Sequence, residues 1–133
     1  MRESGFSLSV DLPDLDHEEA TRRVVEKLDD EGFGILTEIN VKDTLKKKLN
    51  VEYPRYVILG ACNPPLAHRA LAAELDIGVL LPCNVVVAER PGGGSIVSAM
   101  DPVAAFELID NPTVEPIARE VRQKLERVLE QLP

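Results

Sequence analysis

Residues 60–89 read GACNPPLAHRALAAELDIGVLLPCNVVVAE, and this stretch decides how the rest of the chain is organised. The apolar run just before it, residues 56–62, is typical of a central strand covered on both faces. A Pro-Pro pair ends that strand and opens a helix rich in Ala and Leu. Residues 80–90 then form the longest strand candidate. Both cysteines and one of the two histidines, His68, fall in this stretch.

The residues before this stretch predict two strands and a helix. Residues 6–12 alternate apolar and polar side chains, which indicates a strand with one buried face. A helix capped by Asp14 or Asp16 follows and ends at Gly32. Residues 33–39 predict the second strand. We expect four of its side chains on one face: Phe33, Ile35, Thr37 and Ile39.

The next segment combines a helical pattern with a run of lysines. Val41, Leu45 and Leu49 recur every fourth residue, so we expect a short amphipathic helix. Its other side carries Lys42, Lys46, Lys47 and Lys48. Two interpretations stay open for these lysines. They form either an ordinary solvated helix face or a local basic patch that holds an anionic ligand.

The C-terminal part predicts a hairpin followed by two helices. Residues 90–95 contain three glycines without the spacing of a phosphate-binding loop, so they indicate a turn. Residues 96–100 return as the partner strand. A short helix begins at Asp101, and the apolar stripe of residues 114–132 marks a long terminal helix. We expect one α+β domain over residues 1–133, with two layers, a mixed or largely antiparallel sheet and helices mostly on one face.

Composition excludes several functional classes. The chain has 133 residues and a net charge of −8, so nucleic acids and anionic membrane surfaces are disfavoured as partners. No apolar run approaches the ~20 residues of a membrane span, and the N-terminal residues lack the apolar core of a secretory signal. We therefore expect a cytoplasmic protein whose two cysteines are reduced.

The candidate site centres on the end of the central strand. Cys62 ends this strand, and with Asn63 as the N-cap it lies beside unpaired backbone N–H groups, which lower the pKa of a thiol. His68 lies one turn further along the helix. Cys83 and Asn84 follow at the start of the next strand. These five residues are our candidates for a small-molecule pocket.

Three kinds of chemistry stay open for this site. Cys62, His68 and Cys83 offer ligands suited to zinc or copper, although their spacing matches no strong zinc pattern. A redox pair of the two cysteines requires Cα atoms within ~7 Å, which antiparallel neighbouring strands allow and a parallel crossover forbids. Nucleophilic catalysis would use Cys62 with His68 as base and Glu74 or Asp76 to orient it. The sequence shows no complete catalytic set, so it leaves open whether the protein is an enzyme.

Three strings of the chain resemble the domain of unknown function 302 family. They are ILTEINVKDTLKKKL at 35–49, YVILGACNPPLAHRAL at 56–71 and IGVLLPCNVVVAE at 77–89. The family's hallmarks are Gly-x-x-Asn-Pro-x-x-Ala followed by Leu-Leu-Pro-Cys, and the resemblance covers roughly residues 5–125. The matching motif positions are Gly60, Asn63, Pro64, Ala67, His68, Leu81, Pro82, Cys83 and Asn84.

This resemblance implies a small α+β domain that forms homodimers and has no settled activity. We therefore expect a dimeric small-molecule-binding or regulatory domain with its pocket near Asn63, His68 and Cys83. The alternative is a metal- or thiol-dependent redox protein that uses Cys62, His68 and Cys83. A third hypothesis is a purely structural or interaction role, in which the motif residues only shape the turn and the dimer surface, and a long exposed apolar strand edge at residues 96–100 would suit it.

Overall fold

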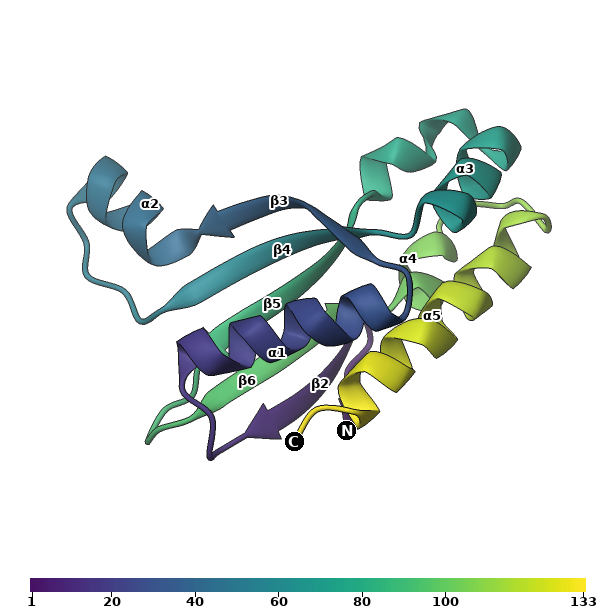
Figure 1. The fold of residues 1–133 in the computed structure, drawn as a ribbon. Coiled ribbons are helices and arrows are strands. Elements are labelled where there is room, and N and C mark those ends of the chain that lie inside the picture. Colours follow the sequence, from purple (N-terminus) through teal and green to yellow (C-terminus); the bar gives the residue numbers. More distant parts are fainter.

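The computed structural model describes all residues from Met1 to Pro133. One layer is a six-stranded sheet in the order β1-β2-β6-β5-β4-β3 (Figure 1). All neighbouring strands are antiparallel. The bounds are β1 (Arg2–Glu3), β2 (Ser7–Leu12), β3 (Gly34–Asn40), β4 (Tyr56–Cys62), β5 (Cys83–Glu89) and β6 (Ser95–Met100).

The second layer consists of helices, and α1 and α5 lie across one face of the sheet (Figure 1). The short helix α2 protrudes beyond the ends of β3 and β4, and none of its residues is buried. The predicted two-layer α+β fold is confirmed. The bounds are α1 (His17–Asp30), α2 (Val41–Leu49), α3 (Pro64–Ala73), the 3₁₀ helix η1 (Leu75–Leu80), α4 (Pro102–Phe106) and α5 (Val114–Glu130).

The hydrophobic core lies between the sheet and the two long helices. Every second residue of the inner strands points into it, as the strand period of two requires. Burying each of these aliphatic side chains contributes about 1.5–3 kcal/mol. The fully buried members include Leu8, Leu59, Val85, Val87 and Val97 from the sheet, with Val24, Leu28 and Leu125 from the helices.

The opposite face of the sheet carries no helix, which corrects one prediction. We expected β4 to be covered on both faces because its sequence is almost entirely apolar. Val57, Leu59 and Ala61 are buried under the helices, whereas Tyr56 and Ile58 are only half-buried on the open face. The sequence of β4 is therefore almost entirely apolar because its side chains on the uncovered face of the sheet are apolar too.

A bulge in β3 corrects a second prediction. Ile35 pairs with Ala61 and Thr37 pairs with the adjacent Gly60, so Leu36 is the extra residue between them. An extra residue reverses the side on which the following side chains lie. Ile35 therefore packs against the core, while Thr37 lies on the open face, and the expected single face is wrong.

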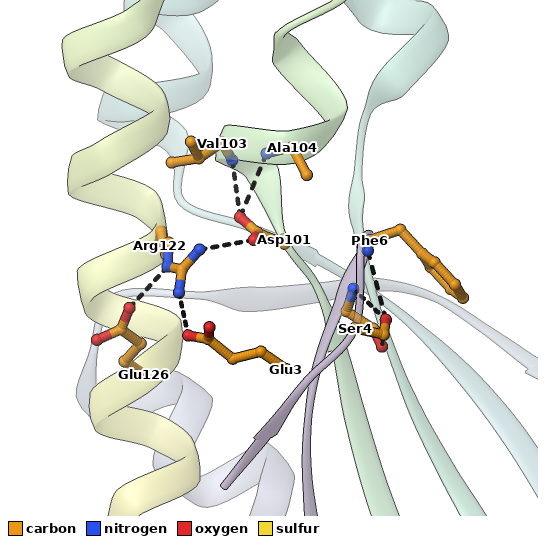
Figure 2. A network of polar contacts seen from close by, with 9 residues as sticks. Glu3, Ser4, Phe6, Asp101, Val103, Ala104, Arg122 and Glu126 are labelled. Carbon is orange, nitrogen blue, oxygen red and sulfur yellow. Dashed lines mark hydrogen bonds and ion pairs between the residues drawn. The ribbon is translucent and has the colours of Figure 1, made fainter.

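A partly buried ion-pair network ties the chain's first strand to its last helix (Figure 2). Arg122 of α5 donates to Asp101 at 2.6 Å and to Glu126 at 2.7 Å, and it also contacts Glu3. The hydrogen bond to Glu126 is the main cause that raises the pKa of Arg122. Asp101 also caps α4, because its Oδ1 accepts the backbone N–H of Val103 at 3.0 Å.

Candidate functional site

An apolar cavity of about 290 Å³ opens where β4 ends and β5 begins. Thirteen of its sixteen lining residues are hydrophobic, and none carries a charge. The walls come from the ends of these two strands, from α3 and from α5. Such a cavity has the apolar character of a small-molecule site and lies at the lower limit of the usual size range.

Helix α3 forms one wall and leaves room because two of the four residues on its cavity side are alanines. Ala67 and Ala70 line the cavity together with Leu66 and Leu71. These positions recur at the i, i+1, i+4, i+5 spacing of a single helix face. The space therefore follows directly from small side chains at core-facing positions.

The remaining walls come from distant parts of the chain. Phe33 precedes β3, Phe106 ends α4, and Ile117 and Val121 lie on α5. The sequence predicted Ile117 and Val121 only as members of an amphipathic stripe. No signal in a single sequence distinguishes a residue that lines a cavity from one that fills the core.

The side chain of Asn63 fixes the N-terminal end of α3. Its Oδ1 accepts the backbone N–H of Leu66 at 3.3 Å, and its Nδ2 donates to the carbonyl of Glu31 at 3.3 Å. The predicted N-cap at Asn63 and helix start at Pro64 are confirmed. Because the amide donates to the end of α1 and accepts from α3, it positions the start of α3 against the end of α1.

The two cysteines lie at the same end of the sheet. Ala61 pairs with Cys83 across β4 and β5, so the antiparallel alternative holds, and both Cys62 and Cys83 line the cavity as free thiols. Burial, with a smaller contribution from nearby Cys62, raises the pKa of Cys83 to about 11. Cys83 is therefore a neutral thiol at pH 7, the opposite of an activated nucleophile.

His68 and Asn84 lie away from the cavity. A helix turns 100° per residue, which puts His68 on the far side of α3, where it is exposed. Asn84 follows Cys83 in β5 and so lies on the open face of the sheet. No group of three or more His, Cys, Asp or Glu side chains is arranged to hold a metal ion. The structure therefore does not bring Cys62, His68 and Cys83 together as the expected zinc or copper set, and His68 does not line the cavity that holds Cys62.

These features define a small α+β domain with one antiparallel sheet, helices on one face and an apolar cavity at the strand ends. The sequence profile of the family described as Domain of unknown function DUF302 matches residues 8–132, and the chain belongs to this family. The predicted family is thus confirmed. None of the helices of this chain combines the length and apolar character needed to cross a membrane.

A solved structure is similar to the chain over nearly its whole length. It is the crystal structure of an uncharacterized conserved protein DUF302 from Bacillus stearothermophilus, with a TM-score of 0.87 and 30% sequence identity. The match covers 96% of this chain and 98% of that chain. A comparison with curated proteins gives no match. The family therefore supplies a fold without a settled function.

Proposed function

We propose that the protein is a small-molecule-binding domain whose ligand occupies the cavity between β4, β5, α3 and α5. The observation that carries this proposal is an open cavity of about 290 Å³ whose lining includes buried core residues such as Phe33, Leu66 and Ile117. Protein interiors are close-packed, and an unfilled space of this size lowers stability unless something occupies it. Binding of a ligand offsets that cost.

The chemistry of the lining favours binding over catalysis. The cavity contains no carboxylate, amine or imidazole that could act as a general acid or base. Its buried thiol, Cys83, stays protonated at neutral pH. The metal- or thiol-dependent alternative has no comparable support, because His68 is exposed and does not line the cavity with the two cysteines, and no ligand set converges.

A fragment screen by thermal shift tests this proposal with two matched variants. Ala67→Leu fills the cavity, whereas Ala72→Leu adds the same atoms to an exposed position of the same helix. Compounds that stabilise the wild type should also stabilise Ala72→Leu and lose their effect on Ala67→Leu. Hits that stabilise Ala67→Leu equally would place binding elsewhere and contradict the proposal.

We also propose that the domain works as a homodimer that covers the open face of the sheet. Ile39, Ile58 and Val86 lie side by side in register on this face. Two further apolar side chains, one at the end of α2 and one shortly after it, are well exposed, Leu49 at 65% and Tyr53 at 40%. Contiguous exposed apolar surface marks interaction sites, and a two-fold axis brings identical faces together.

Cytoplasm is the compartment that we propose. Both cysteines are free although they lie on neighbouring strands. Two cysteines that stay free on neighbouring strands are consistent with a reducing compartment, where thiols are not oxidised to disulfides.

A further inference from the structure

We infer that the ligand of the cavity is a neutral aromatic molecule of about two fused rings, held by burial of apolar surface without an ion pair. This inference rests on the proposed function and names the class of ligand for the same cavity. Four properties of the cavity restrict the class of ligand: the absence of charge in its lining, its few hydrogen-bonding groups, its volume and its aromatic side chains.

The lining excludes charged ligands. No Lys, Arg, His, Asp or Glu faces the cavity, so an ionised group inside it would have no counter-charge. Moving an unpaired charge out of water into such surroundings is far more costly than moving a neutral group. A carboxylate, phosphate or ammonium group would therefore have to stay outside the cavity.

The lining also offers few hydrogen bonds to a ligand. Asn63 is the only amide side chain in it, and one of its two N–H groups and its oxygen already serve Glu31 and Leu66, so little of its hydrogen-bonding capacity is left for a ligand. No buried side-chain nitrogen or oxygen in the protein lacks a partner. The other heteroatoms among the lining side chains are the sulfurs of Cys62 and Cys83, which are polarizable and make favourable contacts with aromatic rings.

The size of the cavity sets the size of the ligand. An apolar cavity of ~150 Å³ in another protein binds benzene. The cavity here, at about 290 Å³, has roughly twice that volume and so fits about two fused rings.

The aromatic side chains indicate a flat ligand. The chain contains three phenylalanines and no tryptophan, and two of the three, Phe33 and Phe106, line the cavity. Aromatic rings prefer offset or edge-to-face contacts with other rings. Such a concentration of a rare residue type around one cavity favours an aromatic occupant over a flexible aliphatic chain.

Three probes of matched shape test the inference by calorimetric titration of the full chain at pH 7. They are 1-naphthylmethanol, which is neutral, 1-naphthoate, an anion, and 1-naphthylmethylammonium, a cation. We expect the neutral probe to bind at least about 100-fold more tightly than either ion, because neither charge finds a partner. Its binding should be lost in Ala67→Leu and kept in Ala72→Leu, with both variants first shown to be folded by circular dichroism.

Each other outcome overturns a distinct claim. If either ion binds as tightly as the neutral probe and loses binding in Ala67→Leu, the ligand class is wrong while the proposed function stands. If a straight-chain alcohol of equal carbon number binds better than 1-naphthylmethanol, the aromatic assignment is wrong. If none of these probes binds and the fragment screen gives no compound sensitive to Ala67→Leu, the proposed function fails together with the inference.

Discussion

The backbone of Gly60 lies so close to the side chain of Thr37 that no Cβ fits between the two residues. On the other side, a Cβ on Gly60 would come within 2.8 Å of the ring of Pro82. Strands β3 and β4 and the segment before β5 therefore converge on one glycine. This convergence fixes the end of β4, which forms part of the cavity wall through Ala61 and Cys62.

Replacing Gly60 by alanine should lower the free energy of unfolding by about 1–3 kcal/mol, because the neighbouring strands would have to shift. Urea unfolding measures this change. The matched control is Gly34→Ala, since Gly34 also lies in a paired strand but has no atom within 4 Å of its would-be Cβ. Equal effects of the two substitutions would show that the close approach at Gly60 does not limit stability.

Asp101 should be the most sensitive polar residue of the fold. Its side chain is only 8% exposed, and it both caps α4 and pairs with Arg122. Asp101→Ala removes both roles and should cost about 2–4 kcal/mol in urea unfolding. Asp101→Asn keeps the cap and should cost less.

The control for this network is an exposed ion pair on the same helix. Glu115→Ala breaks the pair with Arg119, whose two side chains are 65% and 58% exposed. Such a pair contributes little, so the change should stay within about 0.5 kcal/mol. An effect of Asp101→Ala as small as that of Glu115→Ala would contradict the structural role of the network.

Cys83 should make stability fall at alkaline pH. Its pKa is about 11 in the folded protein against an ordinary 9.0, so the unfolded chain loses the thiol proton first. The contribution is fully present below pH 9.0 and is lost progressively up to about pH 11. Two pKa units correspond to about 3 kcal/mol at most.

Urea unfolding of the wild type and Cys83→Ala across this pH range isolates the effect, because all other titrating groups are common to both proteins. The stability difference between them should change with pH above 9.0. Cys62→Ala, at the half-buried neighbouring thiol, should retain most of the wild-type slope. A difference between wild type and Cys83→Ala that stays constant with pH would contradict the burial of this thiol.

The proposed dimer makes the open sheet face sensitive to charge. Ile58→Glu places a carboxylate between Ile39 and Val86 on this face and should shift the protein to monomer in sedimentation equilibrium. Leu108→Glu is the control, because Leu108 is 84% exposed and lies away from the sheet face. A wild type that is monomeric at high micromolar concentration would contradict the dimer proposal directly.

Local sequence signals predicted most of the elements of this fold. Three such signals are the alternation of apolar and polar residues in 6–12, the apolar residues at every fourth position in 41–49, and the Asn-Pro start of α3. Each depends on residues that are close together in the sequence. In such patterns the neighbouring residues themselves determine whether a segment forms a helix or a strand, and the structure has the predicted elements at these places. The family motifs also marked Ala67 and Pro82, which line the cavity.

The errors arose where long-range contacts decide the outcome. The bulge at Leu36 depends on how β3 pairs with β4, and it moved Thr37 to the other face. The expected strand from residue 80 begins only at Cys83, because Leu80 still belongs to η1 and residues 81–82 connect η1 to β5. His68 was grouped with the cysteines through its place in the sequence, whereas the turn of α3 carries it away from them.

The most direct test of the cavity as a ligand site is a methyl NMR titration with 1-naphthylmethanol. The methyl groups of Ala67, Ala70 and Leu66 should shift with a single saturable binding curve, because they line the cavity. The methyl group of Ala99, buried in the same core on β6 but outside the lining, should not follow that curve. Shifts that cluster on another surface, or none at millimolar probe, would contradict the assignment of this cavity as the binding site.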